Sequence, residues 1–126
     1  MSKRYIFVVL LLAAVAIPAF GATSAWAVGT DPFATNDTPS NANSFNPAGD
    51  IKITRIAKGT YQIRFEKLGP LSAGGNVQVT PVNTISTFCS VTSFVKTGKD
   101  ILVSIRCYDL KGALVDARYS VLFTTK

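Results

Sequence analysis

The feature that most constrains the fold is an alternation of apolar and polar residues over positions 50–126. The period is two residues throughout, and no segment carries the 3.6-residue apolar stripe of an amphipathic helix. Turns that contain Gly interrupt the alternation at short intervals. The pattern predicts an all-β domain, a small antiparallel sandwich or barrel. We expect about six strands, near residues 51–56, 60–65, 76–82, 86–94, 101–108 and 113–124.

The start of the chain has the three parts of a secretory signal peptide. Lys3 and Arg4 precede an apolar run over residues 5–17, and Ala25 and Ala27 supply small side chains at the −3 and −1 positions of a peptidase site. The run is shorter than the roughly 20 apolar residues that span a bilayer, which disfavours an uncleaved anchor. We therefore predict cleavage near Ala27 and a secreted protein, extracellular or periplasmic, that keeps no transmembrane segment after cleavage.

Residues 28–49 are rich in Asn, Thr, Ser, Pro and Ala and show no periodicity. Such a segment buries too little apolar surface to offset the entropy of ordering it. Phe33 and Phe45 are its only large apolar side chains. The predicted organisation is thus a signal peptide over 1–27, a disordered linker over 28–49 and a β-domain over 50–126.

Cys89 and Cys107 are the two cysteines of the chain, and such a pair is normally oxidised in an exported protein. A three-residue loop over 97–99 places them directly opposite each other, whereas a loop over 96–98 leaves them diagonal and hard to bridge. We choose the first register because the disulfide requires it. The spacing is not C-x-x-C, which favours a structural bond over a redox-active one. In the chain-entropy model such a bond stabilises the fold by roughly 3 kcal/mol.

The turn over 109–112 predicts a hairpin between the last two expected strands. Asp109 suits the first position of a type I turn, and Gly112 suits the position where φ is positive. If Asp109 pairs with Ala113, Arg106 lies opposite Asp116 as a favourable cross-strand ion pair.

The turn at Gly59 predicts a second hairpin, between the first two expected strands. In its register Lys52 lies opposite Arg64, and Asp50 lies opposite Glu66. These are like charges, and diagonal contacts between the oppositely charged members of the two pairs would relieve the repulsion.

The composition disfavours most enzyme chemistry. The chain has no His, so it has no imidazole base and no His-ligated metal, and two Cys cannot form a four-thiolate zinc site. We expect no enzyme activity, no cofactor and no metal. Glycoside hydrolysis needs paired carboxylates, and turns and ion pairs account for most of those in the domain. Its carboxylates are Asp50, Glu66, Asp100, Asp109 and Asp116.

Basic residues are concentrated in the first expected hairpin and its exit, in a chain whose net charge is +6. One interpretation is a solvated surface that keeps the protein soluble. The other is a face that attracts anionic cell-envelope polymers. Nucleic acid is a poor candidate because no aromatic residues are interleaved for base stacking. The possible anion-binding residues are Lys52, Arg55, Lys58, Arg64 and Lys67.

The segment from Val103 to Val121 contains Cys107, Asp109 and Asp116 in an approximate V-x-V-x-C-(F/Y)-D-x-x-G-x-x-x-D-x-x-(F/Y)-x-V pattern. In this the chain resembles an uncharacterised β-domain of secreted bacterial proteins that is sometimes repeated in tandem. The resemblance implies a secreted β-module with paired cysteines and supplies no catalytic residue.

These features predict a small secreted β-domain that acts as a binding or structural module, at the cell surface or in the medium. Its partner would be an anionic envelope polymer or another protein. A secreted inhibitor or toxin that acts on another protein is the alternative, and a small hydrolase is a third.

Overall fold

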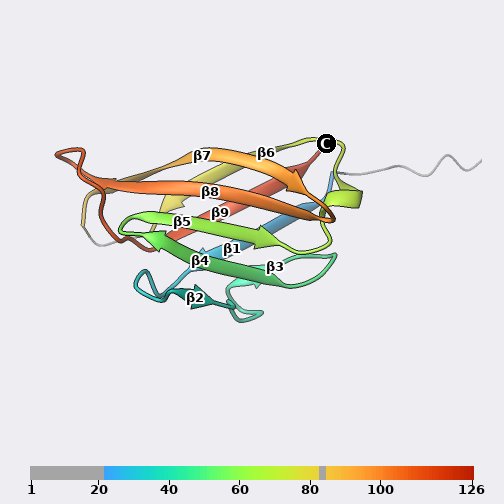
Figure 1. Cartoon of the computed structure of the whole chain (residues 1–126), viewed down its shortest axis with the longest axis horizontal. Coiled ribbons are helices and arrows are strands. Elements are labelled where there is room, and N and C mark those ends of the chain that lie inside the picture. The colour runs from blue at the N-terminus through green and yellow to red at the C-terminus, as the bar shows by residue number, and fades with distance from the viewer. Residues whose placement is uncertain (1–21, 83–84) are drawn as a thin grey trace, which may run out of the picture.

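The computed structural model describes residues 22–82 and 85–126. They form two antiparallel sheets that face each other as an open sandwich (Figure 1). The four-stranded sheet has the order β3-β1-β9-β6, with β1 Ser24–Gly29, β3 Ser44–Phe45, β6 Gly75–Pro81 and β9 Tyr119–Thr125. The five-stranded sheet has the order β2-β4-β5-β8-β7, with β2 Asn36–Asp37, β4 Ile51–Ala57, β5 Thr60–Phe65, β7 Thr87–Thr97 and β8 Asp100–Asp109. A 3₁₀ helix, Gly69–Leu71, lies between β5 and β6. The predicted all-β class is confirmed, as a sandwich.

The core lies between the two sheets and consists of alternate residues of the inner strands, as the period of two predicts. Tyr61 and Tyr119 pack with their ring centroids 4.9 Å apart, and Phe65 lies 6.3 Å from Phe123 on the same measure. Figure 1 shows β6 and β7 along one margin of the sandwich and β2 and β3 along the other. Large side chains therefore fill the space between the two sheets, and edge strands border the sandwich at both margins.

The β4–β5 hairpin confirms the predicted register, with Lys52 paired to Arg64. A β-bulge after Arg55 then shifts the turn, so Ala57 rather than Ile56 pairs with Thr60. The diagonal contact between Lys52 Nζ and Glu66 Oε1 forms at 2.8 Å. The like-charge conflict expected on this face is relieved by that ion pair.

The β7–β8 hairpin places Cys89 directly opposite Cys107, as predicted, and the two are joined by a disulfide. The predicted loop is one residue too long, because Thr97 pairs with Asp100 and leaves a two-residue turn. A bulge between Val91 and Ser93 absorbs the difference. Gly98 in this turn has a φ of 60°, a conformation that glycine adopts without strain.

The predicted hairpin between β8 and β9 is wrong beyond its turn. The turn itself forms as expected, since the Gly112 N–H donates to the Asp109 carbonyl at 3.0 Å and Gly112 has a φ of 81°. Pairing continues as far as Tyr108 and Leu114 and then stops. The chain crosses to the other sheet, where β9 pairs with β1 and β6.

The segment predicted as the end of a signal peptide and a disordered linker is folded over residues 22–49. It supplies β1, β2 and β3, and Ala25 and Ala27 are fully buried in the core. The linker prediction fails because hydrogen bonds order the segment, although every residue from 30 to 49 keeps some exposure. Ser44 Oγ, for example, donates to the Ser40 carbonyl at 2.9 Å, and the Val28 N–H donates to the Asn43 carbonyl at 2.8 Å.

The basic start and the apolar run predicted as a signal peptide lie outside the residues that the structure describes. Within 22–82 and 85–126, no helix has the length and apolar character needed to cross a membrane.

Candidate functional site

The five basic residues of the predicted anion-binding face do not share one face. Lys52 and Arg64 are register partners on the outer side of the five-stranded sheet. Arg55 is the partner of the buried Tyr61 and points to the opposite side, whereas Lys58 lies in the exposed turn that follows β4. Lys67 follows β5 and has a φ of 59°. The structure therefore keeps Lys52 and Arg64 together and separates Arg55 and Lys58 from them.

Three of these basic side chains are neutralised by ion pairs within the protein. The bond to Glu66 raises the pKa of Lys52, and the bond to Asp116 raises the pKa of Arg55. The pKa of Asp100 is lowered, first by the backbone N–H of Lys67 and then by the Arg64 guanidinium. The pairs are Lys52–Glu66 at 2.8 Å, Arg55–Asp116 at 2.9 Å and Arg64–Asp100 at 2.8 Å.

A groove of about 320 Å³ opens between β2 and the outer side of β4 and β5, and Lys52 and Arg64 line it. The carboxylate of Asp37 lines the same groove, together with the neutral Thr54 and Gln62. An anion that entered would meet one acidic and two ion-paired basic groups. The geometry gives the anion-binding interpretation little support.

Asp116 lies at one end of the sandwich and is almost fully buried, with 8% of its side chain exposed. It accepts hydrogen bonds from Nε and Nη2 of Arg55, both at 2.9 Å, from the Gly59 N–H at 2.8 Å and from the Tyr61 hydroxyl at 3.1 Å. The Tyr61 hydroxyl in turn accepts from the Ala117 N–H at 3.2 Å. We call this group the Asp116 cluster.

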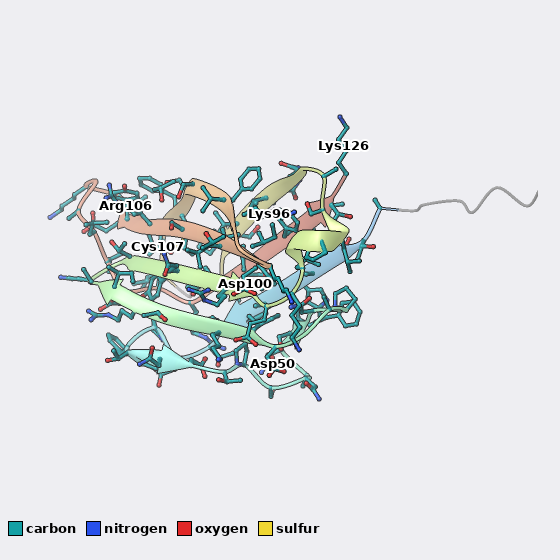
Figure 2. All side chains as sticks on the ribbon, turned by 45° about the vertical axis from the view of Figure 1, so that its right-hand side comes forward. Asp50, Lys96, Asp100, Arg106, Cys107 and Lys126 are labelled. Carbon is teal, nitrogen blue, oxygen red and sulfur yellow. A yellow bond between two sulfur atoms is a disulfide. The ribbon has the colours of Figure 1, made fainter. Side chains whose placement is uncertain are left out.

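The Asp116 cluster replaces the predicted ion pair between Arg106 and Asp116, which is wrong. Arg106 is exposed on the outer side of β8, and Figure 2 shows it and Asp100 toward opposite ends of that strand. The bonds from Arg55 are the main cause of a lowered pKa for Asp116, and burial raises the pKa of Tyr61 to about 12. The bonds of Arg55, Gly59 and Tyr61 to Asp116 join the β4–β5 turn to the segment before β9.

The other acidic residues give no sign of a catalytic pair. Asp109 Oδ1 accepts from the N–H groups of Lys111 and Ala113, at 2.8 and 3.0 Å, and so fixes its own turn. Asp50 lines a pocket of about 220 Å³ beside Phe45 and Asn46. In the part of the chain that the structure describes, no three His, Cys, Asp or Glu side chains are grouped as a metal site would require.

β7 is an edge strand of the five-stranded sheet, and β6 of the other sheet lies near it at the same margin of the sandwich. β7 stands at the end of the five-stranded sheet and pairs with β8 alone among the described strands. All eleven of its residues are described, and none is buried. An edge strand carries backbone N–H and C=O groups that can pair with another chain.

Apolar side chains flank this edge on both sides of the sheet. Phe88 is 48% exposed and stacks on Tyr108 with a centroid distance of 5.1 Å. Phe94 and Val95 are 42% and 48% exposed, and the Phe94 ring meets Phe123 edge-on at 5.9 Å. We define the β7 edge surface as the β7 backbone edge with Phe88, Phe94 and Val95.

A small cavity of about 130 Å³ lies at the far end of the β7 edge surface. Its walls include Phe94, Val95, Ile101 and Phe123 from three strands, together with residues 72–74 of the loop that precedes β6. Lys96 is the one ionisable side chain of β7 and lines the same cavity. The combination offers an apolar cavity next to an almost uncharged strand edge.

Sequence reasoning placed a strand here but did not find its exposed edge. The signal that could have indicated this edge is the near absence of charged residues along β7, whose residues are mostly apolar or carry hydroxyl groups. A search of protein-family models, curated proteins and solved structures finds no match to this chain.

Proposed function

We propose that the protein is an exported binding module that holds an extended segment of a partner protein along the β7 edge surface. One observation carries the proposal. An eleven-residue strand stands at a sheet edge with none of its residues buried and with exposed aromatic residues beside it. Edge strands of natural proteins are usually short or protected by charges, because an open edge invites pairing with another chain.

The chemistry of such binding is β-strand addition. Backbone hydrogen bonds to β7 would provide affinity, and alternate side chains of the added strand would provide specificity. On the inner side, one apolar side chain of the partner fits the cavity beside Phe94. On the outer side, the stacked pair of Phe88 and Tyr108 offers a flat contact, since aromatic groups contribute strongly to binding energy.

The export part of the proposal is supported by the disulfide between Cys89 and Cys107, which is typical of oxidising compartments. A secreted inhibitor or toxin would use the same surface against a particular partner. The ion pairs of Lys52, Arg55 and Arg64 disfavour an envelope polymer as the ligand.

The experiment is capture of partners from the envelope and medium of the producing organism by the oxidised domain, followed by binding measurements on the purified partner. The test variant is Phe94→Ser/Val95→Lys, which alters the β7 edge surface. Leu110→Ser is the matched control, because Leu110 is 78% exposed in the turn after β8, at the opposite end of that strand from the partners of Phe94 and Val95. We expect the test variant to lose at least about tenfold in affinity, or about 1.4 kcal/mol, and the control to bind normally.

Amide exchange locates the contact on the unmodified protein. Protection confined to β7 and β8 on binding supports strand addition. Equal affinity of the test variant and the wild type contradicts the proposal. Loss of binding in Lys52→Glu/Arg64→Glu alone also contradicts it, because the binding site would then include those basic residues.

A further inference from the structure

Strand β1 is an interior strand of its sheet, between β3 and β9. It pairs with β9 along its whole length, from Ser24 with Thr124 to Gly29 with Tyr119. Cleavage after Ala27 would remove four of the six β1 residues and would leave the facing edges of β3 and β9 without a partner strand. It would also remove two residues, Ala25 and Ala27, that are fully buried in the core.

The residue before β1 is also part of the fold. The Thr23 N–H donates to Thr125 Oγ1 at 2.8 Å, and the Thr125 N–H donates to the Thr23 carbonyl at 2.8 Å. Other pairs of small residues at the −3 and −1 spacing, such as Ala22 with Ser24, would place the cut inside this bonded stretch. A mature chain that keeps all of these contacts must begin at or before Thr23.

The sequence offers a peptidase site that meets this condition. Ala19 and Gly21 are small residues at the −3 and −1 spacing, Pro18 precedes them, and Gly21 lies four residues beyond the end of the apolar run at Ile17. We infer that the export peptidase cleaves the bond between Gly21 and Ala22, so that the mature protein begins at Ala22. This inference rests on the export part of the proposed function.

The step is hydrolysis of one peptide bond. Water adds across the Gly21–Ala22 amide, Gly21 leaves with a new carboxylate, and Ala22 keeps the new α-amino group. Ala22 is exposed in the structure, so this charged group lies in solvent ahead of β1. Loss of the leader also removes Lys3 and Arg4, which lowers the side-chain net charge from +6 by two.

The first test is the intact mass of the exported wild-type protein, made from the full-length chain in an exporting bacterial host. The expected mass is that of residues 22–126 less two hydrogens for the disulfide. A mass that begins at Val28 overturns the inference, and so does an uncleaved chain.

Two leader variants test the site itself. Ala19→Lys/Gly21→Leu places large side chains at both small-residue positions, and Phe20→Ser changes the position between them, where size is not restricted. We expect the first variant to accumulate as precursor and the second to yield the same mature mass as the wild type. If the first variant still begins at Ala22, the inference fails.

These outcomes are independent of partner binding. A protein that begins at Ala22 and binds nothing at β7 refutes the proposed function alone, and a β7-binding protein cut elsewhere refutes this inference alone.

Discussion

Strands β1 and β7 show opposite relations between sequence and burial. β1 has six residues, and its buried positions are filled by Ala25, Ala27 and a glycine. β7 has eleven residues, including Phe88 and Phe94, and all of them retain exposure. The difference shows that burial of a strand in this fold follows from its neighbours in the sheet. An interior strand is covered even when its side chains are small, and an edge strand stays open even when they are large.

The small residues of β1 have a packing reason. A Cβ added at Gly29 would lie 2.7 Å from Cζ of Tyr119, which is closer than real contacts allow. The ring of Tyr119 therefore occupies the space that Gly29 leaves, and a bulky residue at Gly29 would displace it.

The largest expected difference in stability between the two strands comes from placing a carboxylate on each of them. Ala27→Asp puts a carboxylate in the core without a partner, and we expect a loss of about 4 kcal/mol or more and a largely unfolded chain. Ser90→Asp on exposed β7 should change stability by less than about 0.5 kcal/mol. Urea denaturation of the two variants measures the difference, and similar losses would contradict the assigned positions of the strands.

The second effect concerns how β7 is held, since none of its residues is fully buried. The disulfide closes a loop with a sequence separation of 18 residues, and its removal in Cys89→Ala/Cys107→Ala should destabilise the protein by about 3 kcal/mol. Amide exchange should then show β7 opening before β1. If β7 remains as protected as β1 in the variant, its attachment does not depend on the disulfide.

The third effect tests the Asp116 cluster, which holds the segment that leads into β9 and so to β1. Because its pKa is lowered in the folded state, Asp116 stabilises the protein above its unfolded pKa of about 3.9. That stabilisation is lost as the pH falls through the folded-state pKa. Asp116→Asn should lose about 2 kcal/mol at pH 7 and show a weaker loss of stability on acidification.

Asp50→Asn is the matched control for that measurement, because Asp50 is exposed. The slope of the unfolding free energy against pH, measured between pH 7 and pH 2, should differ from that of the wild type in Asp116→Asn and not in Asp50→Asn. The same slope in the wild type and Asp116→Asn would exclude Asp116 as a source of the acid sensitivity.

The smallest effect is expected at the β7 edge surface itself. Val95→Ser removes apolar area that is already 48% exposed, so stability should fall by no more than about 0.5 kcal/mol. Thermal unfolding measures it, with Val103→Ser in the core as the comparison. A loss from Val95→Ser as large as that from Val103→Ser would mean that Val95 is part of the core.

Most of the five-stranded sheet could be predicted from the sequence, because its pairings join strands that are close together in the chain. Period two, the turn at Gly59 and the two cysteines define neighbouring strands and their registers. The four-stranded sheet depends on contacts between distant segments. The expected hairpin ends at the Asp116 cluster. No residue near Asp116 in the sequence indicates that its partner is Arg55.

β1 was not predicted as a strand, for a different reason. Alternating small residues are required both by a signal peptidase and by a strand packed against large rings, so Ala25 and Ala27 satisfy both patterns. The β7 edge surface was missed because a sequence pattern identifies a strand without saying whether a neighbour covers it.

The bonds between Thr23 and Thr125 join residues that are 102 positions apart. Sheet formation at β1 therefore has to wait until β9 has left the ribosome. Until then β1 lacks the strand with which it pairs along its whole length. The order in which residues become available thus sets when this protein can fold, and closing so long a loop makes that step a slow one.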